Sequence, residues 1–321
     1  MQAPTIFISG TGRSGTNITK AIFGLHSQCA ILPFEYRFTI DPGGLVDFIN
    51  SYSATWSPYS ADKKIKDLES YLLSLSKIKE QQSEINNWIS EYDATGKKLT
   101  PYPYAGWELE KWIPGYQELV KTLIKDLIDF EYNGRWPGTA ALISNNSMYF
   151  SAPTTKEELI KPISVFLNSC INSILTKDKK KVFVEDNTWS ILYAADLLKI
   201  LPQGRMLHIR RDPRDVIASL IGQKWCPNDL TQILKWYKSV IGQWEKQKSI
   251  LDKSQYLEID FENIINNTTE TVEKMCEFAN ISFEEKMVSL DLSKANIGRY
   301  KKQFSQKEIE LIDSKLMQSQ I

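Results

Sequence analysis

The chain has 321 residues, enough for one or two domains with a buried core. Lysine and arginine together number 39, as do aspartate and glutamate, so no overall charge favours a nucleic acid or a membrane surface as partner. The four cysteines form no CxxC pair, which is typical of buried free thiols in a reducing compartment.

The first predicted elements are a strand, a glycine loop and a helix within residues 6–17, IFISGTGRSGTN. Gly10 and Gly15 have the spacing of the phosphate-binding loop GxxxxGK[ST], where backbone N–H groups and a helix N-terminus bind an anion. Thr16 and Asn17 replace the lysine and the Mg²⁺-binding hydroxyl of nucleotide triphosphatases, and the loop's cation is Arg13. A simple glycine turn is the alternative. The pattern favours a phosphate site for a group transferred without metal.

Further strands and helices alternate along the chain. Short β-type runs lie at 5–9, 182–185, 206–210 and 256–259, and helical patterns follow at 16–25, 188–200, 213–221 and about 229–251. Two capping boxes, Asn267 with Glu270 and Ser305 with Glu308, precede two more helices. This alternation predicts an α/β fold, a phosphate-loop-like central parallel sheet flanked by helices.

Residues 45–150 have a different composition, rich in tyrosine and tryptophan and broken by prolines. We interpret 45–175 as a helical insertion within a single domain of residues 1–321. Because the insertion follows the loop–helix unit, we expect it to cap the acceptor site through Trp56, Trp107, Trp112 or Trp136. The alternative is that these tryptophans belong to the core.

A second anion site is predicted in RRDPRDVIAS, residues 210–219. Arg211 stands at the carboxyl end of a strand, where open α/β sheets place ligands, and Ser219 lies about two helical turns later. Together they can bind a phosphate separate from the one at the first loop. The alternative is a charged surface with a local Arg214–Asp215 pair.

The two segments together resemble the 5′-phosphosulfate loop and the 3′-phosphate motif of sulfotransferases that use 3′-phosphoadenosine 5′-phosphosulfate (PAPS). The resemblance is to bacterial-type enzymes with a glutamate base, like the protein-tyrosine and carbohydrate sulfotransferases. It covers the first 40 residues and most of 180–310. It implies that the loop residues hold the 5′ group, with Arg13 at the phosphosulfate bridge, and that the C-terminal segment closes over the 3′-phosphate. The implied donor-binding residues are Gly12, Arg13, Ser14, Gly15, Thr16, Asn17, Arg211, Ser219, and Arg299 or Lys301.

The predicted catalytic base is Glu35, which lies where the resembled enzymes carry a glutamate followed by an arginine. A carboxylate just past the loop–helix unit can accept the proton of an acceptor hydroxyl. The alternative is a solvent-facing pair of Glu35 with Arg37. His26 is expected at the surface or as a cap, His208 in the core, and Asp186 and Asn187 either contact substrate or cap a helix.

We therefore expect a cytoplasmic sulfotransferase that moves SO₃ from PAPS to a hydroxyl or amine and releases adenosine 3′,5′-bisphosphate. No metal and no nucleic-acid partner are expected. No membrane span is expected either, since no apolar run approaches roughly 18 residues. A phosphate-loop kinase-like phosphotransferase and a non-catalytic nucleotide-binding protein are the rival interpretations. Acceptor identity (a glycan, a peptide tyrosine or a small metabolite) and oligomeric state are left open by the sequence.

Overall fold

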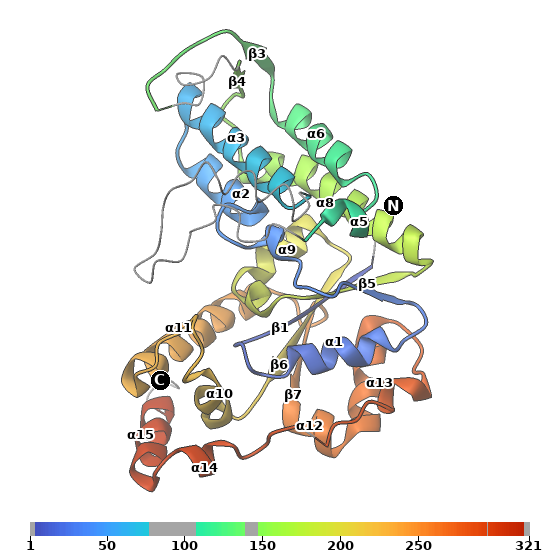
Figure 1. The fold of residues 1–321 in the computed structure, drawn as a ribbon, viewed down its shortest axis with the longest axis vertical. Coiled ribbons are helices and arrows are strands. Elements are labelled where there is room, and N and C mark those ends of the chain that lie inside the picture. Colours follow the sequence, from blue (N-terminus) through green and yellow to red (C-terminus); the bar gives the residue numbers. More distant parts are fainter. Residues whose placement is uncertain (1–3, 77–106, 139–146, 294, 318–321) are drawn as a thin grey trace. The chain divides into compact units, whose positions relative to one another are not determined.

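The structure is a computed structural model that describes residues 4–76, 107–138, 147–293 and 295–317 (Figure 1). The chain divides into two compact units. The helical unit comprises residues 37–179, and the sheet unit combines 4–36 with 180–321. The predicted insertion at 45–175 falls within the helical unit, and its role as an acceptor cap stays a prediction.

The sheet unit contains five parallel strands in the order β2-β5-β1-β6-β7. The α/β parallel-sheet prediction is confirmed, and so are the four predicted strands. The edge strand β2 was not predicted, because three residues are too few to show a pattern. The strands are β1 (Thr5–Gly10), β2 (Cys29–Ile31), β5 (Val182–Asp186), β6 (Gly204–Arg210) and β7 (Tyr256–Asp260).

Helices follow the strands as the sequence predicted. They are α1 (Thr16–Gly24), η2 (Thr188–Tyr193), α9 (Ala194–Ile200), α10 (Pro213–Leu220), α11 (Leu230–Lys248), α12 (Phe261–Asn266), α13 (Thr268–Ala279), η3 (Glu285–Val288), α14 (Tyr300–Gln303) and α15 (Gln306–Met317). The capping box of Ser305 and Glu308 before α15 is confirmed. The one at Asn267 is wrong, because that side chain makes no hydrogen bond to the start of α13.

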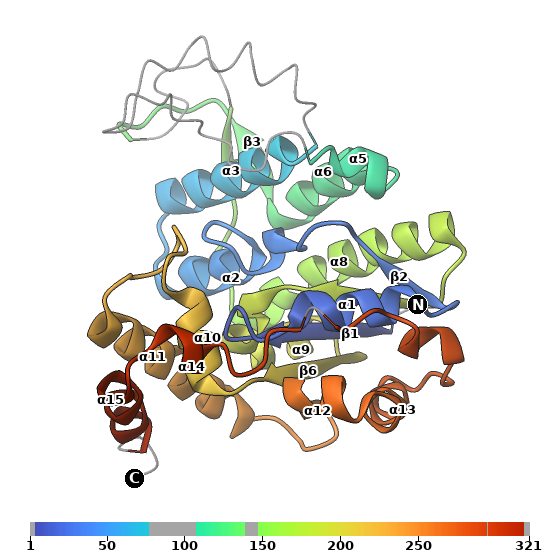
Figure 2. The same ribbon diagram turned by 60° about the horizontal axis from the view of Figure 1, so that its bottom comes forward.

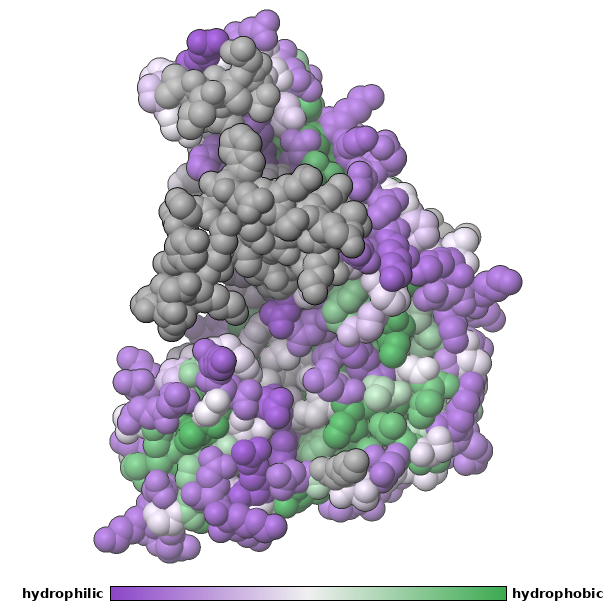
Figure 3. All heavy atoms as spheres, in the orientation of Figure 1, coloured by the Kyte–Doolittle hydropathy of each residue, from purple (hydrophilic) through white to green (hydrophobic). Residues whose placement is uncertain are grey.

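Both faces of the sheet are buried, as a parallel sheet requires. On one face, Ile8 and Ile209 pack in a core with Phe23 of α1 and Met275 of α13. In both ribbon views α1 lies along β1 (Figures 1 and 2). The opposite face carries His208, whose ring contacts Trp244 of α11 at a centroid distance of 4.8 Å. Figure 3 shows hydrophobic residues gathered over α1 and α13 among hydrophilic ones.

Strand register brings the predicted anion motifs to one edge of the sheet. Gly10, the last residue of β1, pairs with Ile209 of β6, so the glycine loop and Arg211 leave the sheet together. Ile8 pairs with Asp186, so the end of β5 reaches the same edge. Ser9 strengthens this alignment, since its hydroxyl donates to the Asn187 and Thr188 carbonyls at 2.9 and 2.8 Å.

The helical unit has a core of its own, in which the rings of Phe38, Tyr116 and Phe166 pack together. Trp136 is exposed and stacks on Tyr59, with ring centroids 4.1 Å apart. The described elements are η1 (Arg37–Thr39), α2 (Leu45–Ala54), α3 (Pro58–Ser74), α5 (Leu109–Trp112), α6 (Tyr116–Leu127), the hairpin β3 (Phe130–Tyr132) and β4 (Met148–Phe150), and α8 (Lys156–Asp178).

One described helix, α8, is long and apolar enough by composition to cross a membrane, contrary to the expectation that no run approaches such a span. Its most apolar window has a mean hydropathy of 1.3, and 44% of that window is buried inside the structure. Core helices pass the same test, and Ile163 and Leu167 of α8 are fully buried, so this is weak evidence for a span.

Candidate functional site

The glycine loop between β1 and α1 has the backbone of an anion-binding loop. Gly12, Arg13 and Gly15 have positive φ angles of 75°, 59° and 108°. At Gly15 a Cβ would lie 2.2 Å from the Phe261 ring, so only glycine fits. No side chain caps the N-terminus of α1, which leaves its first N–H groups for a ligand.

Two loop side chains have the burial and donors that an anion needs. Ser14 is buried, and its hydroxyl has no hydrogen-bond partner in the described part of the chain. Thr16 is also buried, whereas Asn17 is exposed. A buried hydroxyl without a partner is costly, and a bound oxyanion would satisfy it.

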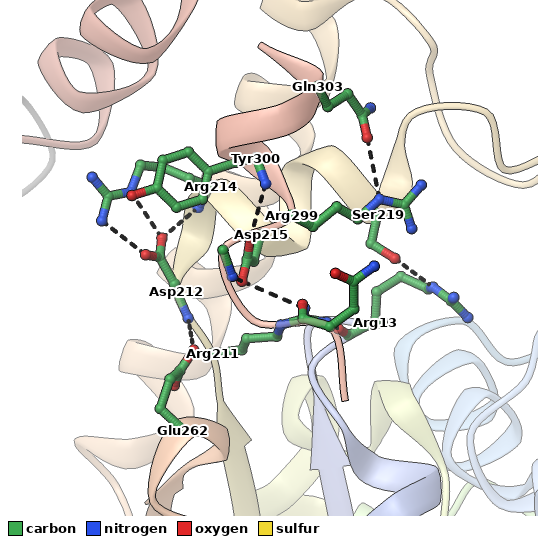
Figure 4. Close-up of polar contacts among 12 residues, drawn as sticks. Arg13, Arg211, Asp212, Arg214, Asp215, Ser219, Glu262, Arg299, Tyr300 and Gln303 are labelled. Carbon is green, nitrogen blue, oxygen red and sulfur yellow. Dashed lines mark hydrogen bonds and ion pairs between the residues drawn. The ribbon is translucent and has the colours of Figure 1, made fainter. Parts of the chain in front are cut away.

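Arg13 joins the two sequence motifs. Its Nε–H donates to the Ser219 hydroxyl of α10 at 3.0 Å, across 206 positions of sequence, and its carbonyl accepts from Arg211 Nη1 at 3.0 Å (Figure 4). The predicted 5′ and 3′ phosphate motifs therefore meet at one place in the sheet unit.

Arg211 is held on several sides. Its guanidinium lies 5.1 Å from the centre of the Phe261 ring, donates to the carbonyl of Asn296 and lies 3.5 Å from the Asp215 carboxylate. Its Nε–H is buried and has no hydrogen-bond partner among the described residues. The side chain is positioned by its neighbours while one donor is left for a ligand.

Asp215 anchors the C-terminal segment to this site. Its fully buried carboxylate accepts the Gly298 N–H at 2.7 Å and the Tyr300 N–H at 3.0 Å. The alternative Arg214–Asp215 pair is wrong, because Arg214 instead makes a two-pronged bond to Asp212 at 3.0 and 2.8 Å (Figure 4). Although burial raises the pKa of the Asp212 carboxyl, the bonds from Arg214 outweigh it and hold that pKa below its usual range.

We predict that Asp215→Ala lowers the free energy of unfolding by about 1–3 kcal/mol, because two buried N–H groups lose their acceptor. It should also weaken anion binding at Arg211, which Asp215 orients. Asp313→Ala is the control, since that partly exposed carboxylate lies 3.7 Å from Arg214 and should change stability by less than about 0.5 kcal/mol. Urea denaturation measures the free energy of unfolding of both variants. Equal stability of Asp215→Ala and the wild type would contradict this role.

Arg299 and Lys301, the two candidates for closing over the 3′-phosphate, lie on this anchored segment. Arg299 is partly buried and its Nε–H donates to Gln303 at 3.2 Å. Lys301 is exposed, with its ammonium 5.9 Å from the centre of the Tyr300 ring. Their part in phosphate binding stays a prediction.

Glu35, in the sheet unit, is linked to the glycine loop through Thr188. Its carboxylate accepts a hydrogen bond from the Thr188 hydroxyl at 3.4 Å. The methyl group of Thr188 lies 3.5 Å from the position of a Cβ on Gly12. One threonine therefore hydrogen-bonds to the predicted base and lies near the loop. The catalytic roles of Glu35 and Arg13 stay predictions.

The end of β5 carries Asp186 and Asn187, which the sequence analysis named, and Glu185, which it did not. Glu185 is buried, and burial, then the charges of Asp186 and Glu35, raise the pKa of its carboxyl well above the usual range. Asp186 pairs with Lys20 of α1 at 3.3 Å. Asn187 caps η2 by accepting the Trp189 N–H at 3.2 Å, which supports the capping alternative. The position of Glu185 near the carboxyl end of a strand could have pointed to it.

Neither histidine is positioned to act as a catalytic base at the glycine loop. His26 is fully buried, so the surface prediction is wrong, and it donates from Nε2 to Ser282 while Nδ1 accepts the Gln28 N–H. His208 is buried in β6, as predicted, and burial lowers the pKa of its imidazole. Among the described residues, no group of three histidine, cysteine or acidic side chains is placed to hold a metal ion.

Comparisons with known proteins place the chain in a family. Residues 99–285, more than half of the chain, match the model described as the sulfotransferase family. No curated protein matches. Solved structures with a similar fold include a sulfotransferase from Mycobacterium tuberculosis, 12% identical, which covers 98% of this chain and 76% of its own at a TM-score of 0.45.

Two further structures are similarly distant. The sulfotransferase domain from the curacin biosynthetic pathway is 12% identical, with 99% of this chain and 98% of that domain covered and a TM-score of 0.47. Retinol dehydratase in complex with androsterone and inactive cofactor PAP is 12% identical, with coverages of 99% and 81% and a TM-score of 0.38. At these levels of similarity, the assignment depends on the family match. By that match the resemblance inferred from the two motifs is confirmed, and the chain is an enzyme that belongs to the sulfotransferase family.

Proposed function

We propose that this enzyme transfers the sulfuryl group of PAPS to an acceptor hydroxyl and releases adenosine 3′,5′-bisphosphate. The observation that carries the proposal is the pair of hydrogen bonds that joins Arg13 to Ser219 and to Arg211. Through them, two anion motifs far apart in sequence converge on one site, as a donor with phosphates at both 5′ and 3′ positions requires.

The donors at the site suit such a ligand. The Ser14 hydroxyl and the Arg211 Nε–H are buried hydrogen-bond donors without a partner in the described residues. The uncapped N-terminus of α1 adds backbone N–H groups and the positive end of its dipole. All three favour oxyanions, so the residues present fit PAPS.

When bound, PAPS supplies a sulfuryl group activated by its bond to phosphate. The chain's own residues then have separate tasks. Glu35 accepts the proton of the acceptor hydroxyl, and Arg13 stabilises the negative charge that develops on the leaving oxygen. The loop N–H groups orient the donor, which makes the displacement effectively intramolecular.

The donor is tested by comparing ligands in thermal unfolding. We expect adenosine 3′,5′-bisphosphate to raise the melting temperature more than AMP or ADP, without Mg²⁺, because only it contacts both motifs. A charge-assisted hydrogen bond contributes about 1.5–3 kcal/mol, so loss of the 3′-phosphate should weaken binding by roughly 10- to 150-fold. Arg211→Ala should remove most of that difference.

Two outcomes would contradict the proposal. One is equal stabilisation by AMP and the bisphosphate. The other is a requirement for Mg²⁺ with ATP, which would favour the kinase-like alternative. Release of the bisphosphate from PAPS in the presence of an acceptor then separates a transferase from a protein that only binds the nucleotide.

A further inference from the structure

Three tryptophans from separate segments of the sheet unit form one cluster. Trp189 of η2 lies 6.0 Å from Trp225 and 5.3 Å from Trp236, measured between ring centroids. Trp225 lies 5.9 Å from Trp236, which belongs to α11. We call Trp189, Trp225 and Trp236 the tryptophan cluster. None of the three was selected from the sequence, because they are separated by up to 47 positions.

The cluster lies directly against the glycine loop. The tip of the Trp225 indole, Cη2, is 3.0 Å from the position of a Cβ on Gly12. The Thr188 methyl group is 3.5 Å from that same position, and the Thr188 hydroxyl donates to Glu35. Trp225 and Thr188 thus lie near the same residue of the anion loop, Gly12, and the hydrogen bond of Thr188 links this place to the proposed base.

Trp225 is held in place although it is half exposed. The turn that carries it begins at Gly222, whose φ of 89° allows the chain to leave α10. The Gly222 N–H donates to the Asn228 side chain at 2.9 Å, and the Cys226 thiol donates to the Leu220 carbonyl at 3.1 Å. An indole that is 49% exposed on such a closed turn is a fixed apolar surface in water.

Ring geometry indicates what this surface binds. The planes of the rings cross at 78°, 85° and 56°, so no two indoles form a parallel slot for a flat aromatic ring. A phenol gains most when both of its faces leave water. A sugar ring packs one C–H face on an indole while the hydroxyl groups around it stay hydrated. A single half-exposed indole beside polar backbone therefore suits a sugar.

We propose that the tryptophan cluster binds a sugar ring of the acceptor, so that the enzyme sulfates a carbohydrate hydroxyl. This inference rests on the proposed function. In the transfer, the sugar oxygen forms the new S–O bond and its proton passes to Glu35. The bond from sulfur to the bridging oxygen breaks, and its electron pair stays with the bisphosphate.

The test measures transfer from PAPS to methyl glycosides of glucose, galactose, N-acetylglucosamine and glucuronic acid, and to 2-naphthol and a tyrosine peptide. Wild-type enzyme should sulfate at least one glycoside in preference to both phenols. Trp225→Ala should raise the KM for that glycoside by about 10- to 100-fold, whereas Trp225→Phe should retain most of the affinity. Ile250→Ala, which removes another exposed apolar side chain of the sheet unit, should leave the KM unchanged.

Affinity for the bisphosphate, measured by calorimetry, separates this inference from the proposed function. The affinity for the bisphosphate should be the same in Trp225→Ala and wild type. An unchanged affinity would also show that the variant folds. Three outcomes would each overturn the assignment. The enzyme could prefer a phenol, or Trp225→Ala could leave the KM for the glycoside unchanged. The third outcome is that glycosides are not sulfated and do not quench tryptophan fluorescence. If the wild-type enzyme did not bind the bisphosphate, the choice of donor would be overturned instead.

Discussion

Replacing Glu35 with glutamine should lower the turnover number of sulfuryl transfer by about 10²- to 10⁴-fold, the usual contribution of a positioned general base. Glutamine keeps the size of the side chain and can still accept the hydrogen bond from Thr188, but it cannot take a proton. Affinity for the bisphosphate should therefore be nearly unchanged. Steady-state kinetics with PAPS and calorimetry with the bisphosphate measure the two quantities.

Glu185→Gln is a matched control for this experiment. Glutamine matches the size of this buried side chain, and burial, then the charges of Asp186 and Glu35, raise the pKa of the Glu185 carboxyl well above its usual range. We expect turnover within a few-fold of the wild type. If Glu35→Gln retained near-normal turnover while Glu185→Gln lost it, the base would have been assigned to the wrong carboxylate. Asp186, the other carboxylate at this edge, would be tested next.

Arg13→Ala should lower the turnover number by about 10²- to 10³-fold, with a smaller effect on affinity for the bisphosphate. The guanidinium stabilises charge mainly as the leaving oxygen becomes anionic, so its loss acts on the transition state more than on the bound donor. Arg211→Ala should do the opposite and mainly raise the KM for PAPS. Single-turnover measurements separate chemistry from donor binding.

A lysine variant sharpens the test of Arg13. Arg13→Lys keeps the charge but cannot reproduce the Nε bond to Ser219, so it should recover part of the turnover. Arginine, lysine and alanine all carry a Cβ, so neither Arg13→Lys nor Arg13→Ala changes the backbone strain of the positive φ of 59° at this position. If Arg13→Ala and Arg211→Ala both reduced only affinity, the proposed division of roles would be wrong.

The sequence alone determined the features that depend on neighbouring residues. The strands predicted at 5–9 and 206–210 are largely apolar runs, and Gly10 and Gly15 have the spacing of a phosphate-binding loop. Their order along the chain was enough to predict a parallel sheet, since strand–helix alternation leaves few other topologies. Glu35 was predicted from its place after the first loop–helix unit together with the family resemblance.

Tertiary structure decided which distant groups meet. The hydrogen bond from Arg13 to Ser219 depends on the register that pairs Gly10 with Ile209, which no local pattern contains. Asp215 was expected to pair with Arg214 and instead accepts two backbone N–H groups from the C-terminal segment. The raised pKa of the Glu185 carboxyl and the tryptophan cluster also arise from the fold, because burial and ring contacts depend on side chains that only the folded sheet brings together.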